Sequence, residues 1–193
     1  SILSPMLSNI FLHYVLDEWF ENTVKKHTGY CELIRYADDF VCVVRYAKDA
    51  ERIEKALENR FNKYGLEIHP EKSRKISFGR FETANAKKQK RKPNTFDFLG
   101  ITHFCAKSRR GNFKVGRKTS RKKYSQKCRE MNNWLKAVRN QAKAKDWWKT
   151  LQAKLRGHIQ YYGVSENYYW IMKFYKTTVK LTKKWMNRRS QIG

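Results

Sequence analysis

Two adjacent aspartates, Asp38 and Asp39, stand between the apolar stretches Leu33–Ile34 and Phe40–Val44. Strands favour β-branched and aromatic residues and are depleted in aspartate, so the pair predicts a tight turn joining two strands. Carboxylates this close repel each other, and such pairs are commonly held by a divalent cation, usually Mg²⁺, that also binds a phosphate. The pattern indicates metal-dependent phosphoryl chemistry, and an ordinary surface turn is the alternative.

The elements around this turn are predicted to be mixed. Apolar residues at helical spacing predict helices over residues 9–26 and 48–64, the second ending at Gly65. Alternating patterns predict strands within 31–45 and over 66–69, 75–78 and 96–104. A turn signal at 109–112 predicts that 113–115 returns as a hairpin partner. The basic segment 82–94 lacks large apolar residues and is predicted to be a mobile loop.

The rear of the chain is predicted to be wholly helical from Thr119 onward. Three helices are expected over about 120–140, 146–162 and 165–189, by their periodicity and caps. The two connections between them are short, which favours an antiparallel three-helix bundle.

The charge of the chain is concentrated in this helical part. The net charge is +26 overall, yet residues 1–60 carry 8 Lys/Arg against 10 Asp/Glu, whereas residues 101–193 carry 25 against 3. With 6 Trp and 11 Tyr the basic part is not a disordered tail, so a folded module that binds a polyanion is predicted. The basic residues are spread over several segments, which favours nucleic acid over an anionic membrane surface.

Several classes of protein are excluded or disfavoured. No stretch of 18 apolar residues exists, so no transmembrane helix is expected, and the first residues do not resemble a signal peptide. The four cysteines are scattered, which favours a reduced cytoplasmic protein of bacterial type, with an organelle as the alternative. His103 and Cys105 could form half of a metal site, but no second pair completes it.

Six segments in order resemble the reverse transcriptase/maturases encoded by group II introns. Arg35-Tyr36-Ala37-Asp38-Asp39-Phe40 is similar to their palm hairpin, and Gly157-His158-Ile159-Gln160-Tyr161-Tyr162-Gly163 to the signature of their thumb, called domain X. The other similar segments are 4–13, 65–73, the primer-grip-like 96–100, and Arg188-Arg189-Ser190-Gln191.

The resemblance implies an α+β fold: a partial polymerase palm over 1–116, with helices on an antiparallel sheet, and a basic three-helix thumb over 117–193. It implies an RNA-directed DNA polymerase (a nucleotidyltransferase of a mobile element) that also serves intron splicing as a maturase. The implied cofactor is Mg²⁺, and the implied partners are intron RNA as template, a DNA primer or target, and deoxynucleoside triphosphates. The chain does not begin with Met, and the family's fingers, its Pro-Gln-Gly turn and its first palm aspartate are not in it, so a fragment is expected.

The same resemblance implies roles for residues near the turn. Asp38 and Asp39 become catalytic metal ligands, with Asp38 the more direct one. Tyr36 and Ala37 shape the floor beneath the primer terminus, although strand packing is an alternative for Tyr36. Lys72 reaches a phosphate, with a solvent-exposed ion pair to Glu71 as the alternative. Leu99 and Gly100 bring their backbone close to the primer, with a place in a core strand as the alternative.

A set of side chains in the helical part is predicted to face RNA, with strongly salt-dependent binding. The set is Lys123, Arg129, Lys154, Arg156, His158, Lys173, Lys180 and Lys184. For His158, packing against Tyr161 and Tyr162 is the favoured alternative. The tryptophans at helical spacing are expected in the bundle core.

Two other hypotheses remain open. A non-catalytic RNA-binding splicing factor, or a remnant that keeps the thumb surface, would bind RNA without needing Asp38 and Asp39. A reverse transcriptase of another lineage, such as those of retrons or diversity-generating elements, would keep the chemistry, although the thumb segment disfavours it.

Overall fold

The computed structural model describes residues 3–141 and 143–188. The chain divides into two compact units, Ser1–Ser77 and Phe78–Gly193. The division lies ahead of a three-stranded sheet that the sequence assigned to the first domain, and the sheet is part of the same compact unit as the helical bundle.

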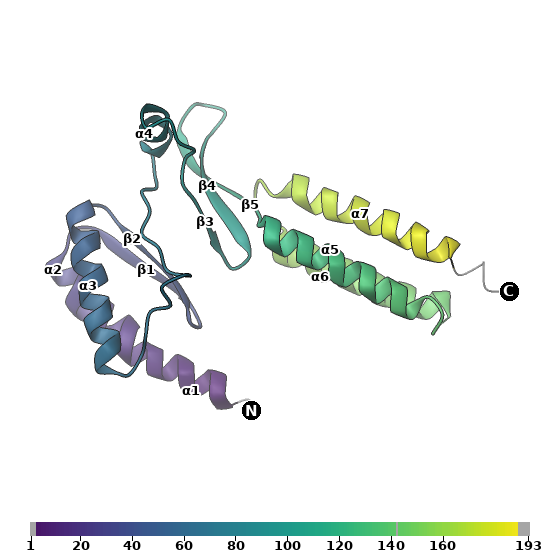
Figure 1. The fold of residues 1–193 in the computed structure, drawn as a ribbon, viewed down its shortest axis with the longest axis horizontal. Helices are drawn as coiled ribbons and strands as arrows, with labels where there is room; N and C mark the ends of the chain where they lie inside the picture. The colour runs from purple at the N-terminus through teal and green to yellow at the C-terminus, as the bar shows by residue number, and fades with distance from the viewer. Residues whose placement is uncertain (1–2, 142, 189–193) are drawn as a thin grey trace. The chain divides into compact units, whose positions relative to one another are not determined.

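The first unit begins with one continuous helical run (Figure 1) made of α1 Leu3–Leu12, the π-helical segments η1 His13–Asp17 and η2 Phe20–Val24, and α2 Lys25–His27. The run starts earlier than the predicted residue 9. It ends where Thr28 turns extended. Gly29 follows at a point of close approach, because a Cβ there would lie 2.8 Å from the ring of Tyr46.

The predicted strand–turn–strand and second helix are confirmed. Strands β1 Cys31–Tyr36 and β2 Asp39–Val44 pair antiparallel. The helix α3 Ala47–Lys63 follows, and Gly65 at a φ of 69° stops it two residues after its end. Side chains alternate between the two faces of a strand. One face of the hairpin therefore packs on both helices, through a core that includes Phe20, Ile53 and Phe61.

The predicted strands 66–69 and 75–78 are wrong. These residues form no ladder, and the chain turns at His69–Ser73. Leu66 and Ile68 are partly buried because their side chains pack on the core around Phe61. Their alternation reflects contact with helices and not strand pairing.

The predicted mobile loop over 82–94 is also wrong. It contains α4 Glu82–Lys88, in which Ala86 is fully buried. Glu82 is buried as well, and it accepts hydrogen bonds from the Arg91 guanidinium and the Asn94 amide. A buried carboxylate needs such partners, and they order a segment that has no large apolar residue.

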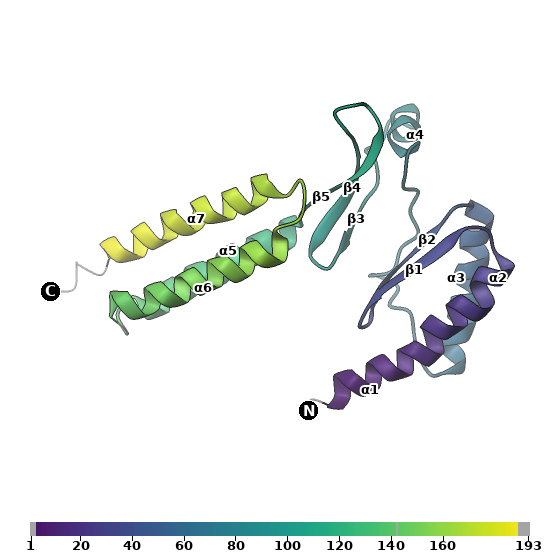
Figure 2. The ribbon, with the colours of Figure 1, turned by 180° about the vertical axis from the view of Figure 1, so that it is seen from behind.

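A three-stranded antiparallel sheet of β3 Thr95–Phe98, β4 Ile101–Lys107 and β5 Phe113–Thr119 follows (Figure 2). The return strand predicted near 113–115 is confirmed. The single strand predicted over 96–104 is wrong, because Leu99 and Gly100 form a two-residue turn with φ of 51° and 76°. Leucine is uncommon at positive φ, so the residue types at this position did not indicate a turn.

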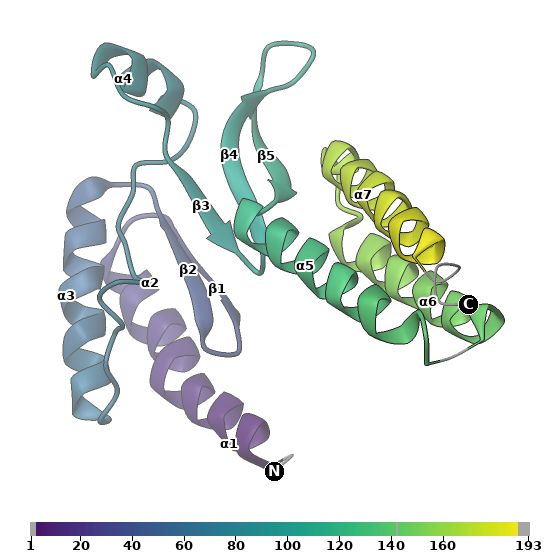
Figure 3. The same cartoon turned by 45° about the vertical axis from the view of Figure 1, so that its right-hand side comes forward.

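Three long helices complete the second unit (Figure 3): α5 Arg121–Val138, α6 Ala144–Tyr162 and α7 Tyr168–Asn187. Tyr124 bonds Thr177 and Asn132 bonds Trp185, the same offset in sequence, so α5 and α7 run parallel. His158 stacks on Phe174 near the start of α7, whereas Trp147 packs with Trp185 near its end, so α6 runs antiparallel to both. The predicted three-helix bundle is confirmed.

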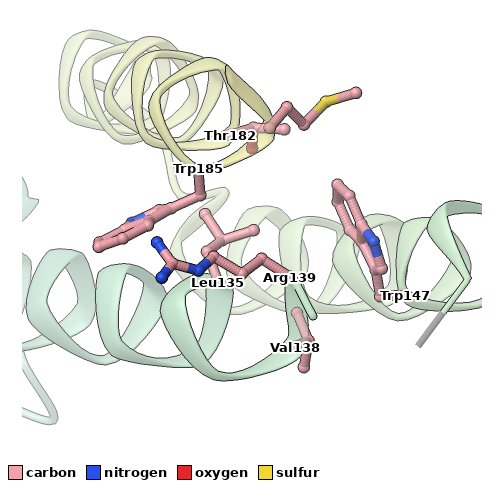
Figure 4. A pocket seen from close by; sticks show the side chains of 7 residues that line it. Leu135, Val138, Arg139, Trp147, Thr182 and Trp185 are labelled. Atoms are coloured by element: carbon pink, nitrogen blue, oxygen red, sulfur yellow. The ribbon is translucent and has the colours of Figure 1, made fainter. Parts of the chain in front are cut away.

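The bundle core includes Met131, Leu135, Leu151 and Phe174 together with two tryptophans. Near the end of α7, Arg139 lies over the Trp185 ring at 4.8 Å, beside a small pocket that Trp147 also lines (Figure 4). The two tryptophans are buried, as expected of core residues, whereas Trp148 is about half exposed.

The fold is thus mixed, with antiparallel sheets and a helical region, which agrees with the predicted α+β class. Across the described residues, no helix combines the length and apolarity that crossing a membrane requires.

Candidate active site

The tip of the β1–β2 hairpin carries the two aspartates. Tyr36 pairs with Asp39 across the ladder, so the turn itself consists of Ala37 and Asp38. The sequence placed both aspartates in the turn, whereas Asp39 is the first residue of β2. The turn begins one residue earlier because Ala37 adopts a φ of +53°.

Asp38 and Asp39 offer a donor set that suits Mg²⁺. Both residues are exposed, and no hydrogen bond or ion pair joins their carboxylates to any other part of residues 3–141 and 143–188. Carboxylate oxygens are hard ligands, and Mg²⁺ is usually held by one or two of them plus water and substrate phosphates. Over the described residues, no group of three His, Cys, Asp or Glu side chains is placed to hold a metal ion.

Arg35 fixes the turn from the covered face of the hairpin. Its guanidinium donates to both carboxylate oxygens of Asp17 at 2.7 and 2.5 Å, to Asn9 Oδ1 at 3.0 Å, and to the Ala37 carbonyl at 2.8 Å. This hydrogen-bonded guanidinium holds the pKa of Asp17 below its usual value. No role for Arg35 or Asp17 was predicted from the sequence, although an arginine in register with Cys31 and Leu33 on a covered face needs a hydrogen-bond acceptor.

Tyr36 lies on the open face of the hairpin, together with Asp39. Its side chain is 66 % exposed, so it is not packed against the rest of the described unit. Lys72 is exposed in the turn that begins at His69, and its amide donates to the His69 carbonyl.

Leu99 and Gly100, predicted to contact the primer, lie in the β3–β4 turn of the second unit. The Tyr161 hydroxyl donates to the Leu99 carbonyl at 3.0 Å, and the Ser120 amide donates to the Gly100 carbonyl at 2.9 Å. A Cβ on Gly100 would lie 3.1 Å from the hydroxyl of Tyr162. The helical bundle therefore holds this turn.

A third residue whose role was not predicted from the sequence is Asn167, which is fully buried. It precedes α7 at the N-cap position, but its side chain makes no capping bond: Oδ1 accepts from the Thr119 amide at 2.7 Å, and Nδ2 donates to Thr119 Oγ1 and to the Tyr162 carbonyl. Asn167 thus joins the end of β5 to the end of α6 and the start of α7. An asparagine in a short polar connection gives no sequence signal for such a role.

Seven of the eight residues predicted to face RNA are exposed, and they are Lys123, Arg129, Lys154, Arg156, Lys173, Lys180 and Lys184. They are not gathered in one groove. Lys154 lies over the ring of Trp134, between α6 and α5, whereas Lys173 lies over Tyr124, between α7 and α5.

His158 is the exception, because its ring is buried between Phe174 and Tyr162. Burial, together with the smaller effect of the positive charge of Lys127, lowers the pKa of His158 to about 4. Its Nε2 has no hydrogen-bond partner among the described residues. The structure places His158 as a packing residue, the alternative favoured from the sequence. Arg189, Ser190 and Gln191, quoted for the thumb resemblance, lie outside the described residues.

Comparison with known proteins gives one result. No curated protein and no solved structure matches the chain. The family Reverse transcriptase (RNA-dependent DNA polymerase) matches residues 1–103, a span that includes the aspartate turn and the Leu99–Gly100 turn. The match covers more than half of the 193 residues, so the chain belongs to the reverse transcriptase family.

Proposed function

We propose that the protein is an RNA-directed DNA polymerase whose catalytic turn carries Asp38 and Asp39, with Mg²⁺ as cofactor. The observation that carries this is a hairpin tip, inside the segment that matches the family, with two adjacent carboxylates that have no hydrogen-bond or ion-pair partner among the described residues. Its substrates would be deoxynucleoside triphosphates, an RNA template and a DNA primer. By resemblance to the family, the polymerase site would also use a further palm aspartate and the fingers, which are not among these residues.

The chain's own residues would contribute positioning and charge. Asp38, in the turn, and Asp39, at the start of β2, would hold the metal, which when bound activates the primer hydroxyl and neutralises the leaving phosphates. Tyr36, across the ladder from Asp39, would support the primer terminus on the open face. Lys72 and the backbone at Leu99 and Gly100 would contact the nucleic acid or the nucleotide.

The experiment is primer extension by the complete product of the gene that encodes this chain. A DNA primer annealed to RNA or to DNA of the same sequence is supplied with deoxynucleotides or ribonucleotides. The proposal predicts Mg²⁺-dependent extension with deoxynucleotides on the RNA template. No extension on either template by the folded protein would contradict it.

A finer proposal concerns the class of reverse transcriptase. We propose a group II intron origin, with residues 117–193 as the thumb or domain X of a maturase that binds intron RNA, in a cytoplasm of bacterial type or in an organelle. The confirmed three-helix bundle and its exposed basic residues support this. Binding of a group II intron RNA at least tenfold tighter than a structured RNA of equal length is expected, and equal affinities would contradict it.

A non-catalytic RNA-binding role is the second candidate, favoured by the excess of Lys and Arg over acids in the bundle. A protein of this kind would bind RNA through Lys/Arg contacts to phosphates, with affinity falling steeply as salt rises. Two measurements distinguish the candidates. The binding role is supported if Asp38→Asn leaves splicing or RNA binding unchanged and the wild type does not extend a primer.

A further inference from the structure

We propose that Arg35 is a positioning residue for the catalytic turn. Its guanidinium is hydrogen-bonded to Asp17 and Asn9 and also donates to the Ala37 carbonyl, and it thereby sets the directions of Asp38 and Asp39. This rests on the proposed function of the two aspartates.

The first support is that all three nitrogens of the Arg35 guanidinium donate hydrogen bonds. On β1, Arg35 follows Cys31 and Leu33 on the face that packs on the helices, and its side chain is only 13 % exposed. Removing a guanidinium from water is costly unless its donors are satisfied. Nε and Nη2 form a bidentate pair with Asp17, which leaves Nη1 for Asn9 and the turn.

The second support is the π-helical segment η1, which brings the two helix partners onto one side. Asn9 and Asp17 are eight residues apart, and an α-helix would separate them by about 80° around its axis, at about 100° per residue. One extra residue in a π turn reduces the separation to about 20°, because the pair then behaves as if seven apart. Both side chains can therefore reach one guanidinium.

The π segment is itself held in place by the neighbouring helix. The Arg60 guanidinium of α3 donates to the carbonyls of Val15 at 3.0 Å and Tyr14 at 3.3 Å, inside η1. A π turn disturbs the regular helical hydrogen bonds, and a side chain that caps its carbonyls offsets part of that loss. The grip on Arg35 thus has support from a second helix.

The third support is the strained turn on which Arg35 acts. Ala37 has a φ of +53°, and this left-handed conformation costs a residue with a Cβ about 1 kcal/mol relative to its usual conformations. The peptide that follows Ala37 carries the carbonyl bonded to Arg35 and the amide of Asp38. Holding this carbonyl fixes the peptide plane directly before Asp38, and the ladder pair of Tyr36 with Asp39 fixes the other side.

The test compares Arg35→Lys with a matched control. Arg35→Lys keeps the charge but loses the fork that reaches Asp17, Asn9 and Ala37 together. Glu32→Gln breaks the Lys25–Glu32 ion pair, which also joins the helical run to β1 but at the far end of the hairpin. Asp17→Asn, a second variant, keeps the shape of the partner and weakens the grip.

Two readouts are taken on the full chain: the ¹⁵N order parameters of Ala37 and Asp38 without metal, and the affinity for Mn²⁺ from paramagnetic relaxation. Arg35→Lys and Asp17→Asn are expected to lower the order parameters from about 0.85 toward 0.6 and to weaken Mn²⁺ binding about tenfold. Glu32→Gln is expected to change neither.

The outcomes separate this inference from the proposed function. Unchanged order parameters, or a loosened turn with unchanged Mn²⁺ affinity, in folded Arg35→Lys would overturn the positioning role. The proposed function fails if the wild type does not bind Mn²⁺, or if it binds Mn²⁺ as tightly after Asp38→Asn. The order parameters then decide by themselves whether Arg35 holds the turn.

Discussion

The hydroxyl of Tyr161 donates a 3.0 Å hydrogen bond to the carbonyl of Leu99, and so joins the end of α6 to the β3–β4 turn. Tyr161 lies in the segment that resembles the thumb signature, and Leu99 in the segment that resembles the primer grip. The two segments are therefore in contact within one compact unit. The turn cannot shift relative to the bundle without breaking this bond.

Removing that hydroxyl should loosen the turn. Tyr161→Phe loses one hydrogen bond, worth about 1 kcal/mol, and leaves the ring in place. Hydrogen exchange at the amide of Ser120, which donates to the Gly100 carbonyl, should accelerate about fivefold, whereas Tyr175→Phe, at an exposed tyrosine of α7, should leave it unchanged. Equal exchange in both variants would show that the bond does not restrain the turn.

Two glycines at positive φ should differ in their tolerance of a methyl group. Gly100 and Gly111 have φ of 76° and 81°, so alanine is disfavoured at both by about 1 kcal/mol. Only at Gly100 would the Cβ meet neighbours, at 3.1 Å from Tyr162 and 3.2 Å from Lys123. Urea unfolding should show a further loss of about 0.5–1 kcal/mol for Gly100→Ala relative to Gly111→Ala. A smaller loss at Gly100 would mean that the contact is not tight.

The buried junction at Asn167 should be the most sensitive polar site of the second unit. Asn167→Ala removes three hydrogen bonds and strands the Thr119 amide, so a loss of about 3 kcal/mol in the free energy of unfolding is expected. Asn133→Ala, at an exposed position of α5, should change it by less than about 0.5 kcal/mol. A loss below about 1 kcal/mol at Asn167 would contradict the junction.

The stability of the bundle should fall in mild acid because of His158. In the unfolded chain this histidine takes up a proton near pH 6.5, whereas in the folded chain its pKa is about 4. Its contribution is therefore lost as the pH falls from about 6.5 to about 4, by about 2 kcal/mol at pH 5. His158→Phe keeps a ring against Phe174 and should remove this part of the pH dependence of urea unfolding. The same slope in both proteins would show that His158 does not cause it.

The parts of the fold that were predicted from sequence are those fixed by local patterns. The stripe of Ile53, Leu57 and Phe61 was enough to identify α3, and Gly65 to end it. Three amphipathic stretches with short connections were enough to identify the bundle. The aspartate hairpin followed from strand-like residues on either side of Asp38.

The wrong predictions concern segments whose structure depends on distant partners. The helix α4 depends on the burial of Glu82 against Arg91, and the Leu99–Gly100 turn on contacts from the bundle, as with Tyr161. The same holds in the candidate site. The two aspartates could be identified from the residues around them. The hydrogen bonds between Arg35 and Asp17 could not, because they require a π segment, which hydrophobic periodicity does not reveal.

Asp38 and Asp39 are proposed to hold the metal of a polymerase. The most direct measurement is the single-turnover rate of nucleotide incorporation on an RNA template, by the complete gene product, for Asp38→Asn against Glu58→Gln. Glu58→Gln removes an exposed carboxylate of α3 and so serves as the charge-matched control. Asp38→Asn is expected to lower the rate at least about 10³-fold at saturating Mg²⁺, while Glu58→Gln keeps the wild-type rate. A rate within tenfold of the wild type in Asp38→Asn would contradict it.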